Sequence, residues 1–199
     1  FILGEKFIKN DNVALILGDN FFYGQNLSEK LRQLTTLKKG ATILLHKVKK
    51  PENYGVAKLD KNNQISKLVE KPKKFFSDLA VTGLYYFDNK VVRLSKKLRP
   101  SKRGEIEIID LINEYKKLGE LNGDVIGRGA AWLDTGTIDD FYKTSAFVEA
   151  IENRQGLKIA CIEEIAFNNK WIGKKQITDS IKFYGNCEYS IYLKKLLNQ

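Results

Sequence analysis

Two short runs of consecutive apolar residues stand out in the pattern of hydrophobic and polar positions. They cover Val13–Leu17 and Ala41–Leu45, and unbroken apolar runs of this length are typical of strands buried on both faces. Between them, Leu27, Leu31 and Leu34 recur with the i, i+4, i+7 spacing of an amphipathic helix. The three segments together predict a right-handed, parallel β-α-β unit.

A stretch rich in β-branched and aromatic residues follows. Tyr54–Leu59 and Gln64–Glu70 flank the turn-forming sequence Asp60-Lys61-Asn62-Asn63, which predicts a hairpin. Leu79–Phe87 is rich in Tyr, Val and Phe and predicts a further strand. The remaining pattern predicts, in order, helix 89–98, helix 105–118, strand 124–127, strand 131–133 and a helix that begins near 137.

The end of the chain is mostly helical by its pattern. Its apolar face would hold Tyr189, Tyr192, Leu193 and Leu196. We therefore predict an α/β fold, with a Rossmann-like mixed, mainly parallel sheet flanked by helices, a small β-rich part and a helical C-terminal tail. We expect a first domain over 1–155 and a helical extension over 156–199.

Composition narrows the classes of partner. The 199 residues carry a net charge of +10, but the lysines are scattered along the chain, whereas a nucleic-acid-binding stripe would concentrate them among aromatic residues. No apolar run approaches the roughly 18 residues that a membrane span requires, and no signal-peptide pattern is present. Cys161 and Cys187 are too few for a disulfide framework or a zinc site. We expect a cytoplasmic protein that binds neither nucleic acid nor membranes.

Two aspartates occupy similar positions at the ends of predicted strands. Asp19 lies in Leu17-Gly18-Asp19-Asn20, and Asp134 lies in Trp132-Leu133-Asp134-Thr135-Gly136. Ligands of open α/β sheets bind at the carboxyl ends of strands, and two carboxylates could hold a hard divalent cation such as Mg²⁺. Each aspartate could equally be a turn former or a helix cap. The metal site therefore requires that the two side chains converge.

Three further segments carry candidate binding groups. Glu70 and Lys71 end a strand, where they could accept hydrogen bonds from sugar hydroxyls and place a positive charge near phosphate, or could simply face water. Arg103 precedes a helix and suits an anion there, although a surface arginine is the ordinary alternative. At Gly55 the backbone could approach a ligand closely, or the glycine could mark a strand bulge.

His46 is the only histidine of the chain and closes a predicted buried strand. We interpret it as structural, because its isolation argues against histidine-based acid–base or nucleophilic catalysis. The sequence also contains no nucleophile elbow, P-loop or zinc-ligand spacing.

Taken in order, these motifs resemble the sugar-1-phosphate nucleotidylyltransferases, and most closely the glucose-1-phosphate thymidylyltransferase family. The resemblance runs in register from residue 1 to about residue 172 and becomes loose after Gly173. The blocks that carry it are LGDNFFYG (17–24), PENYGV (51–56), VEKP (69–72), AVTGLY (80–85), RGEIEI (103–108), GRGAAWLDTGT (127–137) and ENRQGLK (152–158).

The resemblance implies a reaction and the groups that carry it. The reaction converts dTTP and glucose 1-phosphate into dTDP-glucose and pyrophosphate, by direct attack of the sugar phosphate on the α-phosphorus. Asp19 and Asp134 would hold Mg²⁺, while Lys71 and Arg103 would bind the sugar phosphate. Such a step depends on alignment and charge neutralisation more than on side-chain acids or bases.

The resemblance also assigns a sugar pocket to the β-rich part. Glu70 would hold the glucose hydroxyls, and the backbone at Gly55 and Val81 would line the pocket, beside Tyr54. Members of the family are commonly homo-oligomers, so we expect a homo-oligomer of the full-length protein.

Three departures limit what the resemblance implies. Ile138 stands where the family usually has His, and Ile109 stands where Thr is common. The glycine-rich G-x-G-T-R loop that holds the nucleotide phosphates is absent from these residues, and we expect it in a preceding N-terminal part. The chain alone is therefore expected to be inactive. A related enzyme that uses UTP or CTP, or a non-catalytic paralogue that binds nucleotide-sugars, remains an alternative.

Overall fold

The computed structural model describes residues 1–101 and 104–198, and the chain folds into two compact units, Phe1–Thr137 and Ile138–Gln199. Each unit is described separately. The boundary lies just before helix α5 (Ile138–Gln155), which therefore belongs to the second unit. The expected boundary at 155 between the first domain and the helical extension stays a prediction.

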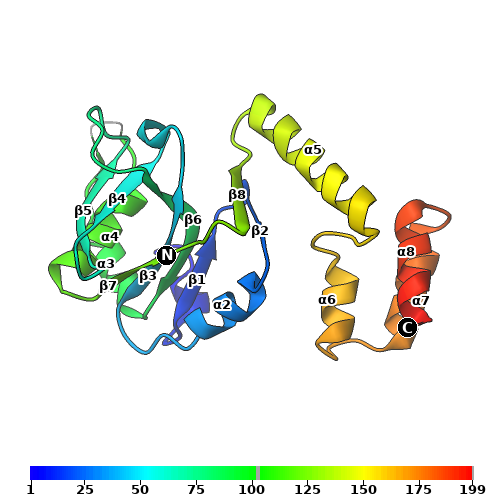
Figure 1. The fold of residues 1–199 in the computed structure, drawn as a ribbon. Helices are drawn as coiled ribbons and strands as arrows, with labels where there is room; N and C mark the ends of the chain where they lie inside the picture. The colour runs from blue at the N-terminus through cyan, green and yellow to red at the C-terminus, as the bar shows by residue number, and fades with distance from the viewer. Residues whose placement is uncertain (102–103, 199) are drawn as a thin grey trace. The chain divides into compact units, whose positions relative to one another are not determined.

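A six-stranded sheet forms the centre of the first unit (Figure 1). Its strands run in the order β5-β4-β6-β3-β7, and β1 also pairs with β6. The strands are β1 (Val13–Ile16), β3 (Ala41–Lys47), β4 (Gly55–Leu59), β5 (Ile65–Glu70), β6 (Leu79–Phe87) and β7 (Leu121–Val125). The predicted hairpin is confirmed, because β4 and β5 pair antiparallel across the turn.

The expected α/β architecture, a mixed sheet flanked by helices, is confirmed, but the expected predominance of parallel pairs is wrong. Among the described strands only β3 and β7 pair in parallel. The long strand β6 lies between β1 and β3 and runs antiparallel to both. In the predicted β-α-β unit, β1 and β3 therefore run in the same direction but are not neighbours. The strand β6, from later in the chain, lies between them.

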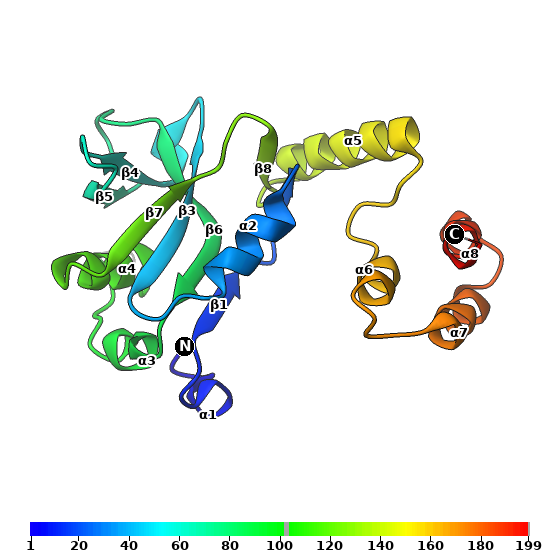
Figure 2. The same cartoon turned by 60° about the horizontal axis from the view of Figure 1, so that its bottom comes forward.

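Helices cover both faces of this sheet (Figure 2). On one face, α3 (Lys90–Ser95) and α4 (Ile108–Lys117) bury apolar side chains against β3 and β6, and Phe87 and Tyr115 are fully buried there. On the other face, α2 (Leu27–Leu34) packs Leu31 and Leu34 against Leu44 and its neighbours. A one-turn helix, α1 (Glu5–Ile8), and a 3₁₀ turn, Pro51–Asn53, complete the connections.

A separate two-stranded ribbon joins β2 (Asn20–Gly24) and β8 (Ala130–Asp134) in antiparallel register. The pattern of the sequence predicts β8 but not β2, because the residues of β2 follow directly on a turn motif. The run Phe21-Phe22-Tyr23 was the available signal, since aromatic residues favour strands.

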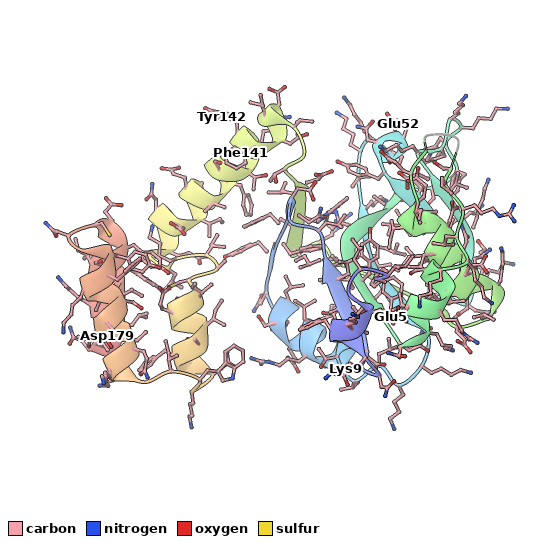
Figure 3. All side chains as sticks on the ribbon, turned by 180° about the vertical axis from the view of Figure 1, so that it is seen from behind. Glu5, Lys9, Glu52, Phe141, Tyr142 and Asp179 are labelled. Atoms are coloured by element: carbon pink, nitrogen blue, oxygen red, sulfur yellow. The ribbon has the colours of Figure 1, made fainter. Side chains whose placement is uncertain are left out.

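The second unit consists of α5, α6 (Ile162–Asn168), α7 (Lys174–Tyr184) and α8 (Glu188–Leu197). Its core contains Cys161, Ile177 and the predicted face of α8, where Tyr192, Leu193 and Leu196 are buried and Tyr189 packs beside them. Phe141 and Tyr142 project from α5 and are mostly exposed (Figure 3). No helix in the described part of the chain combines the length and apolar character needed to cross a membrane.

Candidate active site

The ribbon brings the two predicted aspartates together. Asn20 pairs with Asp134 in the register of β2 and β8, so Asp19 lies beside Thr135. The backbone N–H and the hydroxyl of Thr135 both donate to the carbonyl oxygen of Asp19, at 2.7 and 2.8 Å. The convergence expected from the sequence is therefore present, although it arises from an antiparallel ribbon and not from neighbouring parallel strands.

Gly136 lies next to both the Asp19 and the Asp134 carboxylates. A Cβ atom built on Gly136 would lie 3.2 Å from Oδ1 of Asp134 and 3.6 Å from Oδ2 of Asp19. The two side chains thus face one small volume that any larger residue at position 136 would fill. Oδ1 of Asp134 also accepts the Gly136 N–H at 3.0 Å.

The donor set around this volume fits a hard cation. It offers carboxylate oxygens, and the described residues provide no group of three or more His, Cys, Asp and Glu side chains that could enclose a metal. Mg²⁺ is usually held by one or two carboxylates together with water and substrate phosphates. The residues present therefore fit a magnesium ion shared with a phosphate ligand.

Asn20, which the sequence analysis did not single out, fills the space between the ribbon and the sheet. Its Oδ1 accepts the N–H of Gly83 on β6 at 2.8 Å and the indole N–H of Trp132 on β8 at 2.6 Å. Its Nδ2 donates to Oδ1 of Asp19 at 2.9 Å. One amide therefore contacts the central sheet, the ribbon and a candidate metal ligand.

The predicted sugar-side residues gather where β4 begins and β5 ends. Gly55 pairs with Glu70 in the hairpin, and the N–H of Lys71 donates to the carbonyl oxygen of Tyr54 at 3.0 Å. A Cβ atom on Gly55 would lie 2.6 Å from Cδ1 of Ile109 and 3.1 Å from Oε2 of Glu70. The bare backbone of Gly55 therefore lets Ile109 and Glu70 pack against it, and its close approach to a ligand stays a prediction.

Two aromatic residues connect the sugar-side residues to the aspartates. The ring of Tyr54 lies 5.0 Å from that of Trp132, two residues before Asp134 on β8. Tyr85 on β6 is only 3% exposed. Burial, together with the charges of Glu70 and Asp19, raises the pKa of the Tyr85 hydroxyl. The carboxylates of Glu70 and Asp19 therefore both lie close enough to affect the buried Tyr85 hydroxyl. In the sequence, Tyr85 was predicted only as part of a strand.

The remaining predicted residues have different outcomes. Val81 is buried in β6 and pairs with Leu45 of β3, two residues before Gly83. His46 lies in β3 with its ring centroid 6.1 Å from that of Trp132. Arg103 lies outside the described residues. A separate hollow of about 900 Å³ lies among residues of α4, β5 and β7 and contains none of the predicted site residues.

Comparison with known proteins identifies what the chain is similar to. The sequence model of the nucleotidyl transferase family matches residues 1–151. A glucose-1-phosphate thymidylyltransferase of Neisseria meningitidis is 44% identical over 199 residues, which is 100% of this chain and 69% of the relative.

Two solved structures share the fold. A Bacillus anthracis protein assigned as a glucose-1-phosphate thymidylyltransferase, solved with sucrose, is 40% identical and superposes with a TM-score of 0.64 over 73% of this chain and 57% of that one. A UDP-glucose pyrophosphorylase solved with UDP-glucose, 24% identical, gives a TM-score of 0.65 over 75% of this chain and 60% of its own. The chain thus spans somewhat more than half the length of these solved relatives.

Proposed function

This chain belongs to the nucleotidyl transferase family, and on that basis we propose that it forms the sugar-phosphate-binding part of a glucose-1-phosphate thymidylyltransferase. The enzyme would convert dTTP and glucose 1-phosphate into dTDP-glucose and pyrophosphate. The naming of the Neisseria relative supports the choice of substrates, and the geometry around Gly136 supports the choice of mechanism.

The observation that carries the proposal is the pair of aspartates over Gly136. Asp19 and Asp134 would hold Mg²⁺, with oxygen atoms that face one volume over a glycine Cα. When bound there, such an ion would neutralise phosphate charge. Because Asp134 lies in the ribbon and Asp19 directly precedes it, bonded to the N–H of Thr135, folding brings the two carboxylates together before any ligand arrives.

The other residues of the site would bind and orient the sugar phosphate. Glu70 would accept hydrogen bonds from glucose hydroxyls, with the backbone of Gly55 and Val81 lining the pocket. Lys71 and Arg103 would place positive charge at the phosphate. Tyr54 packs against Trp132, and this aromatic wall would keep water away from the reacting groups.

The chemical step needs no side-chain base. An ionised oxygen of glucose 1-phosphate would form a new bond to the α-phosphorus of dTTP, while the bond from that phosphorus to the bridging oxygen breaks and pyrophosphate leaves. Catalysis would come from alignment and from stabilisation of charge on the phosphoryl oxygens. This agrees with a site built from carboxylates, a lysine and backbone groups.

We propose that these 199 residues alone do not turn over, because they contain no glycine-rich loop for the nucleotide phosphates. The activity test therefore uses a version that also carries the nucleotide-binding segment. Pyrophosphate release is measured with glucose 1-phosphate and each of dTTP, UTP and CTP. Turnover with dTTP supports the assignment. Turnover with UTP alone would show that the enzyme is specific for uridine nucleotides and would refute the assignment.

Substitution of the metal ligands tests the mechanism in the same assay. Asp19→Asn and Asp134→Asn should each lower kcat by about a hundredfold or more, in line with the loss of a major electrostatic group. Asp139→Asn, which removes a carboxylate at the exposed start of α5, is the matched control and should leave the rate within about twofold. Unchanged turnover in both ligand variants would refute the metal mechanism and favour a different role for the aspartates.

A further inference from the structure

We propose that Asn20 is a positioning residue for Asp19. Its side chain donates a hydrogen bond to Oδ1 of Asp19, which leaves Oδ2 free to bind the cation. The inference rests on the proposed metal site, and it concerns a side chain that contacts neither the sugar nor the ion in the proposal above. Its evidence is the three hydrogen bonds of the Asn20 side chain to described residues.

The orientation of the Asn20 amide follows from its partners. The backbone N–H of Gly83 and the indole N–H of Trp132 can only donate, so the atom that faces both of them, at 2.8 and 2.6 Å, must be the oxygen. The NH₂ group then has to face Oδ1 of Asp19, at 2.9 Å. Its orientation is therefore fixed by chemistry as well as by the coordinates.

This arrangement separates the two oxygens of Asp19. Oδ1 accepts the Asn20 amide, whereas Oδ2 is the oxygen that lies toward Gly136 and the carboxylate of Asp134. Without the amide, the carboxylate could rotate about its χ angles and turn both oxygens away from that volume. Partners of metal ligands hold their ligands in this way, and their removal typically weakens metal binding by about 10–100-fold.

Asn20 is itself held from both sides. A Cβ atom on Gly83 would lie 2.5 Å from Cγ of Asn20, so the amide packs directly against the bare backbone of β6. The same amide oxygen fixes the indole of Trp132, which packs against Tyr54. A single side chain therefore sets the positions of a metal ligand and of the aromatic wall on the sugar side.

A purely structural role is the competing explanation, because Asn20 also ties the ribbon to the sheet. Asn20→Asp separates the two roles. The new carboxylate keeps an acceptor oxygen for Gly83 and Trp132, so the ribbon stays attached. It replaces the NH₂ donor by an oxygen of like charge, which would repel Oδ1 of Asp19.

The experiment titrates the 199-residue chain with Mn²⁺ near neutral pH, by electron paramagnetic resonance, and adds Mg²⁺ as competitor. A Trp171→Phe background removes the exposed indole, so that the emission reports the buried Trp132. Asn20→Asp should bind Mn²⁺ about tenfold more weakly, with an unchanged emission maximum and thermal midpoint. Asn26→Asp, which adds the same charge two residues beyond the end of β2, should bind as tightly as the parent.

Each outcome has a defined meaning. Binding by Asn20→Asp that equals or exceeds the parent's overturns the positioning role. Full binding by Asp19→Asn would instead overturn the proposed metal site, and so would absence of Mn²⁺ binding by the parent when glucose 1-phosphate is present to supply the phosphate.

If Asn20→Asp fails to fold, nuclear magnetic resonance of the parent decides the question. The side-chain NH₂ signals of Asn20 should shift when Mg²⁺ is added. Signals that stay unmoved, while Asp19→Asn abolishes binding, would count against the proposal.

Discussion

Asp88 and Asp19 both follow a strand of the same sheet, yet the protein uses them in opposite ways. Asp88, after β6, is 6% exposed and accepts hydrogen bonds from the N–H groups of Gly40 and Lys90 and from the hydroxyl of Tyr115, in addition to an ion pair with the Lys90 ammonium. Asp19, after β1, lies in an exposed turn, and among the described residues its carboxylate accepts one hydrogen bond, from Asn20.

The difference lies in acceptor capacity. The oxygens of Asp88 are occupied by donors of the protein, so its charge contributes to stability and is closed to ligands. Asp19 keeps one oxygen on the side of Gly136 that an oxygen of Asp134 also faces, so that oxygen stays available to a ligand. Position after a strand does not distinguish the two residues, whereas the count of donors does.

The largest expected effect is on stability, at Asp88. Asp88→Ala should lower the free energy of unfolding by about 3 kcal/mol, because it leaves the N–H groups of Gly40 and Lys90 and the hydroxyl of Tyr115 without their buried carboxylate acceptor. Urea unfolding followed by circular dichroism measures the change. Asp179→Ala on the exposed surface of α7 is the control and should stay within about 0.5 kcal/mol. A loss at Asp88 as small as in the control would remove the contrast drawn here.

The next effect is on binding and concerns Gly136. Gly136→Ala should weaken Mn²⁺ binding about tenfold, or about 1.4 kcal/mol, because its Cβ would enter the volume that both carboxylates face. Titration calorimetry measures the affinity. Gly127→Ala places a methyl group where no atom lies within 4 Å, so its affinity should match the parent's. If Gly136→Ala binds equally well, the cation lies elsewhere.

A smaller effect is expected at Tyr115, the buried donor to Asp88. Tyr115→Phe should cost about 1 kcal/mol of stability through the lost hydrogen bond. Burial and the Asp88 carboxylate raise the pKa of Tyr115 above its ordinary value of 10.0. The folded state therefore keeps this proton at alkaline pH after the unfolded state has lost it, so stability falls as the pH rises above that value.

The phenylalanine variant should show a shallower alkaline decline, measured by urea unfolding at a series of pH values. Identical slopes for parent and variant would mean that Tyr115 ionises equally in both states.

The smallest effect is expected at Asp19 itself. Asp19→Asn should leave the free energy of unfolding unchanged or raise it by up to about 0.5 kcal/mol, since Asp19 lies in an exposed turn and residues of functional sites are rarely optimal for stability. Any gain should shrink when salt is added, because exposed charges are screened. A loss of more than about 1 kcal/mol would instead assign Asp19 a structural role like that of Asp88.

Much of the fold could be predicted because its elements carry strong local patterns. Strand β6 is predicted by its apolar run, the β4–β5 hairpin by its turn sequence and helix α2 by the spacing of its leucines. The order of strands was not predictable in this way. The insertion of β6 between β1 and β3 depends on contacts between distant residues, for which one sequence contains no local signal.

In the candidate site, too, the residues with a local sequence pattern could be predicted and those that depend on long-range contacts could not. The approach of Asp19 and Asp134 was predicted because both follow apolar runs. The role of Asn20 was not, since its hydrogen bond to Trp132 joins residues that are 112 positions apart. The burial of Tyr85 near Glu70 and Asp19 likewise depends on tertiary packing. Residues that act through long-range contacts look, in sequence, like ordinary members of a turn or a strand.

The antiparallel register of β2 and β8 makes this part of the protein far more sensitive to length than to composition. Deleting or inserting one residue in either strand would turn alternate side chains to the opposite face, and Trp132 and Asn20 would exchange places with their neighbours. A change of one residue in the length of either strand would therefore remove the contacts of Asn20 with Gly83, Trp132 and Asp19 together.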